Sequence, residues 1–195
     1  MNTLRNFPTR YEGQPPPTGE RWIEEMNKAR AVVETGGIAL FFGKRGTGKT
    51  RMAREIAATA SLRPRAHSPL YKTAMEIFID LKSSYADKST VTEKEVMDEL
   101  KGSALLVIDE LQERGESDFE NQKLTHIVDA RYSRELPTIL IANYTREEFA
   151  ASVSPSILDR IRENGIGVFF DWPSYRAQPD CHVKREPIKP GGIWK

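Results

Sequence analysis

The stretch IALFFGKRGTGKT, residues 38–50, decides the fold of this chain. It begins with Ile38–Phe42, an apolar run without alternation, which is typical of a strand buried on both faces of a parallel sheet. It continues with Gly43–Thr50, which matches the pattern G-x-x-x-x-G-K-S/T, and a helix is predicted directly after it over about Lys49–Ser61. A strand, a glycine-rich loop and a helix in this order predict a phosphate-binding loop.

The chemistry of this loop assigns a role to each part of it. Its glycines let the backbone curl so that successive N–H groups point inward, and the N-terminus of the following helix adds partial positive charge. We expect Lys49 to bridge the β- and γ-phosphates of a nucleotide and Thr50 to hold Mg²⁺ through its hydroxyl group. The predicted nucleotide-binding residues are Gly43, Lys44, Arg45, Gly46, Thr47, Gly48, Lys49 and Thr50.

Helices and strands alternate on both sides of this stretch. Helical spacing of apolar residues predicts helices over Glu20–Glu34, Ala74–Tyr85, Glu93–Lys101, Phe119–Ser133 and Pro155–Glu163. Short apolar runs predict strands over Ala104–Ile108, Thr138–Ala142 and Val168–Phe170, and a weaker strand signal, interrupted by prolines, lies in Arg63–Tyr71. This alternation favours an α/β fold with three layers around a five-stranded parallel sheet.

Length and composition limit the alternatives. The 195 residues suffice for about one domain, so we expect a flexible N-terminal arm at 1–19, a folded domain at 20–176 and a C-terminal tail at 177–195. Lys and Arg total 29 against 28 Asp and Glu, so any contact with nucleic acid must be a local patch. With one cysteine, Cys181, and no apolar run near the roughly 20 residues of a membrane span, the sequence favours a cytoplasmic protein.

Two carboxylates follow the predicted strand Ala104–Ile108. Parallel-sheet proteins place ligands outside the carboxyl ends of their strands, so Asp109 and Glu110 are expected to face the same crevice as the phosphate loop. Asp109 is suited to hold Mg²⁺ through its water shell, and Glu110 to orient, or accept a proton from, the water that attacks the γ-phosphate. Without the phosphate loop, the same pair would indicate no more than a strand that enters a polar loop.

Asn143 and three arginines complete the candidate site. Asn143 follows the predicted strand Thr138–Ala142, and its amide can bond both a water and a phosphate oxygen, although a turn asparagine fits the spacing equally well. Arg160 lies on the helix that begins at Pro155, and its guanidinium could reach the γ-phosphate of a neighbouring subunit, which would make hydrolysis depend on assembly. Arg162 and Arg134 are competitors for this role.

Taken together, these residues resemble an AAA+ ATPase, and more narrowly the helicase-loader group typified by DnaC and DnaI, to which the transposition helper IstB is similar. The resemblance runs from about Trp22 to Arg176. It rests on residues 43–50 and 105–110, Arg131, residues 136–138, Asn143, residues 157–161 and residues 170–176. It implies a P-loop NTPase fold with an AAA+ core and a much reduced C-terminal lid.

The resemblance also implies roles for single residues. Lys49 and Thr50 match the Walker A pair, Asp109 and Glu110 the Walker B pair, Asn143 the sensor 1 residue, Arg160 the arginine finger and Arg176 a sensor 2-like arginine. The implied catalytic residues are thus Lys49, Glu110, Asn143 and Arg160, the metal-holding residues are Thr50 and Asp109, and the implied cofactors are ATP and Mg²⁺.

The implied activity is ATP hydrolysis, and the implied partners are a replicative hexameric helicase, single-stranded DNA and further copies of the chain that share ATP at subunit interfaces. The DNA contact of the group would fall near residues 71–88, where Lys72, Lys82 and Lys88 are available. Members of the group carry an N-terminal domain that grips the helicase. Here the arm at 1–19 does that job, or the chain is a truncated loader, or it acts on another partner.

Two other functions remain open from the sequence. One is a transposase-helper ATPase on duplex DNA, and the other is a nucleotide-gated binding module with little turnover, against which the intact Glu110 and Asn143 argue. The compact size favours a member encoded by a phage or mobile element. His67, His126 and His182 lack the spacing of metal ligands, so Mg²⁺ is the only metal expected.

Overall fold

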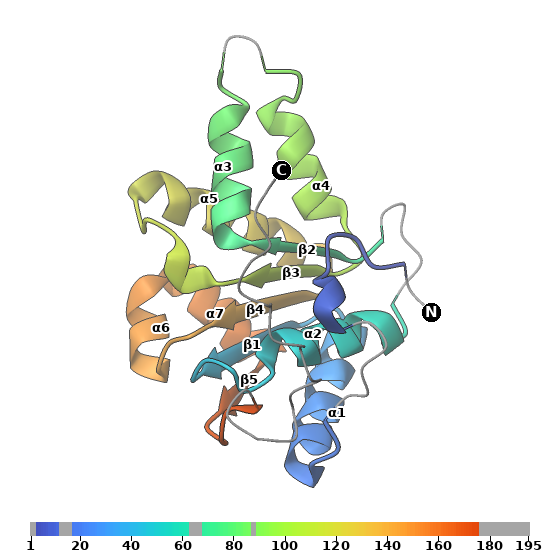
Figure 1. Ribbon diagram of the computed structural model, residues 1–195. Coiled ribbons are helices and arrows are strands. Elements are labelled where there is room, and N and C mark those ends of the chain that lie inside the picture. The colour runs from blue at the N-terminus through green and yellow to red at the C-terminus, as the bar shows by residue number, and fades with distance from the viewer. Residues whose placement is uncertain (1–2, 12–16, 63–67, 87–88, 176–195) are drawn as a thin grey trace, which may run out of the picture.

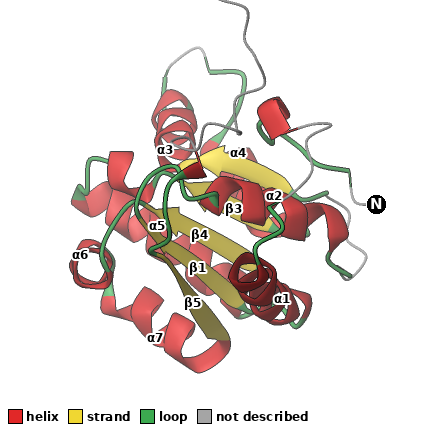
Figure 2. Ribbon diagram, turned by 60° about the horizontal axis from the view of Figure 1, so that its bottom comes forward, coloured by secondary structure: helices red, strands yellow, loops and turns green. Residues whose placement is uncertain are grey.

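A computed structural model of the chain describes residues 3–11, 17–62, 68–86 and 89–175. Five parallel strands form one sheet in the order β2-β3-β4-β1-β5, and helices lie on both sides of it (Figures 1 and 2). The strands are β1 (Ile38–Gly43), β2 (Leu70–Thr73), β3 (Leu106–Asp109), β4 (Thr138–Ala142) and β5 (Gly165–Phe170). The helices are α1 (Glu20–Glu34), α2 (Lys49–Thr59), α3 (Ala74–Ser83), α4 (Glu93–Gly102), α5 (Asp118–Tyr132), α6 (Arg146–Ser152) and α7 (Pro155–Asn164). The predicted three-layer α/β fold is therefore confirmed.

Each face of the sheet carries its own apolar core. Side chains alternate along a strand, so Phe41 of β1 packs with α1 and α2, whereas its neighbour Leu40 packs with the layer formed by α3 to α7. The same division separates Ile141 from Leu140 on β4. Because helices cover both faces, the central strands are apolar throughout, which explains why they lack alternation in the sequence.

The order of the strands fixes where the loops meet. After β1 the chain runs through α2 to β2, the strand at one side of the sheet. It then returns through the neighbouring strands β3 and β4, and it passes β1 to reach β5 at the other side. Crossovers between parallel strands are right-handed, so this reversal of direction places α2 on the opposite face from the later helices. The carboxyl ends of β1, β4 and β3 consequently lie side by side at one edge of the sheet.

Two strands differ from the sequence prediction. β5 begins at Gly165 rather than Val168, because its first residues include two glycines that give no apolar signal. A Cβ on Gly165 would lie 2.6 Å from the carbonyl oxygen of Ile161 and 2.7 Å from that of Ile38, so the turn from α7 into the sheet requires glycine. The weak signal in Arg63–Tyr71 corresponds to β2, which begins after Pro69, and residues 63–67 lie outside the described part.

The described N-terminal residues lie against the outer edge of β2 (Figure 1). The Arg5 amide donates to the carbonyl of Pro69 at 3.0 Å, and the Tyr71 amide donates to the carbonyl of Arg5 at 3.0 Å.

The division of the chain into an arm at 1–19, a domain at 20–176 and a tail at 177–195 stays a prediction, and the tail lies outside the described residues. Among the described residues, no helix has the length and apolar character of a membrane span.

Arg131 of α5 is fully buried and connects the end of α4 to the start of β4. Its Nη1 donates to the carbonyls of Leu100 at 2.8 Å and Ser103 at 3.0 Å, where α4 ends. Its Nη2 donates to the carbonyl of Pro137 at 2.7 Å, and its Nε to the hydroxyl of Thr138 at 3.0 Å, where β4 begins. One guanidinium therefore donates hydrogen bonds to buried backbone carbonyls of two segments, the end of α4 and the start of β4.

We predict that Arg131→Met lowers the free energy of unfolding by about 3 kcal/mol, because several buried carbonyls lose their donor. Denaturant titration followed by circular dichroism measures this change. Arg134→Met is the matched control: its side chain is exposed, and we expect a change within about 0.5 kcal/mol. Equal stability of the two variants would contradict the structural role of Arg131.

Candidate functional site

The loop between β1 and α2 depends on its glycines. Gly43, Gly46 and Gly48 have φ values of 120°, 81° and 93°, a region that other residues rarely adopt. A Cβ on Gly43 would also lie 2.5 Å from the carbonyl oxygen of Phe170 on β5. The Gly43 amide donates to the carbonyl of Tyr144 at 3.0 Å, which fixes the start of the loop beside the end of β4. The loop is thus held in a curled conformation at the carboxyl edge of the sheet.

Lys49 lies across this loop at the first turn of α2 and is 5% exposed. Its ammonium donates to the carbonyls of Gly43 at 2.8 Å and Lys44 at 2.6 Å. The hydroxyl of Thr47 also donates to the Lys44 carbonyl, at 2.8 Å. The loop carbonyls therefore hold the ammonium against the curled segment that the sequence predicts to bind phosphate, next to the N-terminus of α2.

Asp109, at the end of β3, is brought together with Thr50 as predicted. The Thr50 hydroxyl donates to Oδ2 of Asp109 at 2.7 Å, the Tyr71 hydroxyl donates to the same oxygen at 2.9 Å, and the Glu110 amide donates to Oδ1 at 2.7 Å. Burial raises the pKa of Tyr71, and the charge of Asp109 raises it further, so this hydroxyl remains a donor. The pairing of a hydroxyl with a buried carboxylate is an oxygen donor set that fits Mg²⁺.

Glu110 follows directly, in the left-handed region with φ 55° and ψ 44°. Its side chain is exposed at the same edge of the sheet. Partial desolvation raises its pKa, as do the charges of Asp109 and Glu113, while Arg45 and Arg10 act in the opposite direction. A non-glycine residue in this conformation stores about 1 kcal/mol or more of strain, which is typical of functional sites. A carboxylate with a raised pKa is suited to accept a proton.

Asn143 follows β4, which lies between β1 and β3, so it lies between the phosphate loop and the two acids. The backbone N–H of Asn143 donates to Oε1 of Gln112 at 2.9 Å. Gln112 belongs to the short turn after β3, and sequence reasoning missed it because nothing in a lone polar residue signals a contact with another strand. This contact fixes the backbone of Asn143 relative to Asp109 and Glu110.

A second contact missed from the sequence comes from the chain after β5. The indole N–H of Trp172 donates to the carbonyl of Thr47 at 2.9 Å, and the Tyr175 amide donates to the carbonyl of Gly46 at 3.0 Å. Trp172 also packs on Phe170, with ring centroids 4.6 Å apart. The aromatic residues that follow β5 were the available sequence signal for a contact of this segment with the rest of the fold. Arg176, the predicted sensor 2-like residue, lies outside the described residues, so its role stays a prediction.

The candidate arginine fingers lie elsewhere on the molecule. Arg160 of α7 is paired with Asp129 of α5 at 3.5 Å and with Glu163 at 3.6 Å, and its guanidinium lies 4.6 Å from the ring centroid of Tyr132. Arg162 is paired with Asp159 at 3.0 Å on the surface of the same helix. The third candidate, Arg134, lies between the end of α5 and the start of β4, at the opposite edge of the sheet from the phosphate loop. The choice among them stays a prediction.

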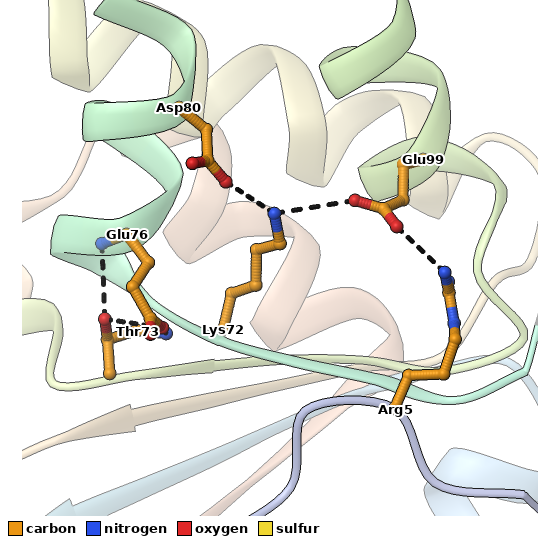
Figure 3. Close-up of polar contacts among 6 residues, drawn as sticks. All are labelled: Arg5, Lys72, Thr73, Glu76, Asp80 and Glu99. Atoms are coloured by element: carbon orange, nitrogen blue, oxygen red, sulfur yellow. Dashed lines mark hydrogen bonds and ion pairs between the residues drawn. The ribbon is translucent and has the colours of Figure 1, made fainter. Parts of the chain in front are cut away.

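The lysines suggested for a DNA contact are engaged in ion pairs. Lys72 lies between Asp80 at 2.5 Å and Glu99 at 3.5 Å, as Figure 3 shows, and its side chain is 13% exposed. Lys82 is paired with Glu120 at 2.8 Å. Lys88 lies outside the described residues. Lys72 and Lys82 are thus each paired with a carboxylate, and a DNA contact in this region stays a prediction.

Comparisons with known proteins agree with this geometry. Residues 39–165 match the model of the ATPase family associated with various cellular activities (AAA). The replicative helicase loader DnaC of Escherichia coli K12 is 33% identical over 181 residues, which is 90% of this chain and 69% of DnaC. DnaC of Buchnera aphidicola from Acyrthosiphon pisum is 29% identical over 174 residues, 88% of this chain and 68% of that protein.

Solved structures show the same fold. The crystal structure of the DnaC helicase loader superposes with a TM-score of 0.65 at 20% identity and covers 84% of this chain and 99% of that one. The crystal structure of DnaI gives a TM-score of 0.63 at 22% identity and covers 85% of this chain and 95% of that one.

We predict that Lys49→Ala reduces the affinity for a fluorescent nucleoside triphosphate at least tenfold, because the only ammonium placed across the phosphate loop among the described residues is lost. Fluorescence titration measures the affinity. Lys94→Ala, which removes an exposed lysine on α4, serves as the control and should bind as the unaltered chain does. Unchanged affinity in Lys49→Ala would mean that this loop is not the binding site.

Proposed function

The chain belongs to the AAA family of ATPases and to the family of the replicative helicase loader DnaC, and from this premise we propose that it hydrolyses ATP to help load a replicative helicase. The hydrogen bond between Thr50 and Asp109, beside the buried Lys49, is the observation that carries the proposal. It joins the phosphate loop to the acid-bearing strand in one site. The chain spans about 69% of the length of DnaC, and we propose for it the helicase-loading activity that the name of that protein states.

In the proposed mechanism, the amides of the loop and Lys49 bind the phosphates, and Thr50 and Asp109 hold Mg²⁺. The metal supplies neutralisation of the charge that develops on the phosphate oxygens. Glu110 orients a water and accepts its proton as the water oxygen bonds to the γ-phosphorus and the bond to the β-phosphate oxygen breaks. ADP and inorganic phosphate are the products. The side-chain amide of Asn143, whose backbone N–H donates to Gln112, fixes the water against the γ-phosphate in this proposal.

The proposed partners are a hexameric replicative helicase, single-stranded DNA and further copies of this chain. Arg160 lies on α7 against α5 rather than at the phosphate loop, so its proposed role as an arginine finger requires a nucleotide that is bound by a neighbouring copy. The DnaC proteins among the relatives are helicase loaders by name, which favours a helicase over a transposase as the target.

Glu110→Gln should lower the rate of ATP hydrolysis about 100-fold while nucleotide affinity stays within a factor of about two, because an amide of the same shape cannot accept the proton. Phosphate release measures the rate, and fluorescence titration measures the affinity. Glu147→Gln, on the exposed first turn of α6, should hydrolyse ATP normally. If Glu110→Gln kept full turnover, the chain would be better described as a nucleotide-gated binding module.

The arginine finger is tested by mixing inactive subunits. Arg160→Ala and Glu110→Gln chains should each be inactive alone, and an equimolar mixture should regain part of the hydrolysis rate, since some interfaces combine an intact arginine with an intact glutamate. Arg162→Ala should remain active. Full activity of Arg160→Ala alone would move the role to Arg162 or Arg134.

Capture of a purified replicative helicase tests the partner. We expect the immobilised chain to retain the helicase in the presence of ATP and Mg²⁺. The immobilised Lys49→Ala variant should not retain it under the same conditions. Retention of a transposase with duplex DNA, and no retention of helicase, would favour the transposase-helper function and contradict the loader proposal.

A further inference from the structure

The N-terminal segment Thr3–Tyr11 does more than cover the edge of the sheet. Arg5 forms a parallel bridge with Leu70, and its backbone exchanges hydrogen bonds with the residues on either side, Pro69 and Tyr71, each at 3.0 Å. The segment therefore pairs with β2 through one isolated parallel bridge at Arg5. An exposed edge strand attracts other chains, and this contact satisfies part of its hydrogen-bonding groups.

The side chain of Arg5 contacts α4 directly and is linked to α3 through Lys72. Its Nη1 donates to Oε1 of Glu99 on α4 at 2.8 Å, and the other oxygen of Glu99 lies 3.5 Å from the ammonium of Lys72. Lys72 in turn contacts Asp80 of α3, so the four side chains form one continuous network (Figure 3). Arg5, Lys72 and Glu99 are all partly buried, and a network of this kind is worth more than an isolated pair at the surface.

Phe7 connects the segment to the functional site. Its ring is 8% exposed and packs against the ring of Tyr71, with centroids 5.4 Å apart and an angle of 47° between the planes. The far end of Tyr71 is the hydroxyl that donates to Oδ2 of Asp109 at 2.9 Å. One face of the tyrosine ring is thus supported by the N-terminal segment, while its hydroxyl orients the carboxylate of the site.

We propose that Tyr71 is a positioning residue for the Mg²⁺-holding carboxylate of Asp109, and that the N-terminal segment, through Phe7, keeps Tyr71 in place. This inference rests on the proposed function of the same site. Thr50 and Tyr71 donate to the same oxygen of Asp109, so the tyrosine fixes that oxygen independently of the residue that binds the metal with it. Partners that orient metal ligands typically change metal affinity 10- to 100-fold when removed.

The proposal implies that docking of the N-terminal segment and binding of Mg²⁺–nucleotide are thermodynamically coupled. Docking of the N-terminal segment and binding of Mg²⁺–nucleotide both favour the same position of Tyr71, so each should strengthen the other. A partner that draws the segment away from β2 would weaken the hold on the metal without touching the phosphate loop.

Tyr71→Phe tests the first part, because it keeps the ring against Phe7 and removes only the hydroxyl. The affinity for a fluorescent ATP analogue is measured with Mg²⁺ and with EDTA, and the ratio of the two affinities reports the contribution of the metal. We expect this ratio to fall about tenfold in Tyr71→Phe, with the affinity in EDTA unchanged. Tyr85→Phe, which removes a hydroxyl bonded to Glu93 on the outer helices, should leave the ratio unchanged.

Phe7→Ala tests the second part and should lower the same ratio in the same direction. If the alanine variant melts below the assay temperature, Phe7→Leu is measured in its place. Leucine keeps most of the apolar volume but removes the ring that packs against Tyr71. An unchanged ratio in Tyr71→Phe would overturn the positioning role, and an effect in Tyr71→Phe without one in the Phe7 variants would overturn the role of the segment. If the unaltered chain itself bound no nucleotide, the proposed function would fail instead.

Discussion

The hydrogen bond from Thr50 to Asp109 joins residues that lie 59 positions apart, and the organisation of the site depends on it. Neither residue could hold a metal alone, because a single hydroxyl or a single carboxylate is a weak ligand for a strongly hydrated ion. The contact exists because the chain crosses the sheet after β1 and returns through β3 and β4. Strand order therefore converts two separate motifs into one site.

The same edge of the sheet is supported from several directions. Tyr144 at the end of β4 accepts the Gly43 amide, and Trp172 after β5 donates to the Thr47 carbonyl, so the phosphate loop is held by the elements on both sides of β1. On the acidic side, Asp109 is 4% exposed and accepts hydrogen bonds from two hydroxyls and one amide. Both oxygens of this buried carboxylate thus accept hydrogen bonds, which compensate for the hydration that is lost on burial.

Patterns local in the chain were predictable from the sequence. The glycine loop and the apolar strands that lead to Gly43 and Asp109 are patterns of a few residues, and the structure places each as expected. The shared position of Thr50 and Asp109 was also predictable, because parallel strands present their carboxyl ends at a common edge.

Contacts between distant segments were not predictable in this way. Tyr71 sits on a strand of four residues next to a proline-rich stretch, and nothing in its neighbours indicates that its hydroxyl reaches Asp109. Gln112 and Arg131 act on backbone groups of other elements, which leave no pattern in the sequence. The partner of Arg160 in catalysis would be a second copy of the chain, so no analysis of one chain reveals its geometry.

The central claim is that the loop at 43–50 and the acid at 109 form one Mg²⁺–nucleotide site. A crystal structure of the chain with a non-hydrolysable ATP analogue and Mg²⁺ tests this most directly. We expect the triphosphate within the loop, against Lys49, with the metal held by the side chains of Thr50 and Asp109. Nucleotide bound at another surface, or a metal held without either of these two residues, would contradict it.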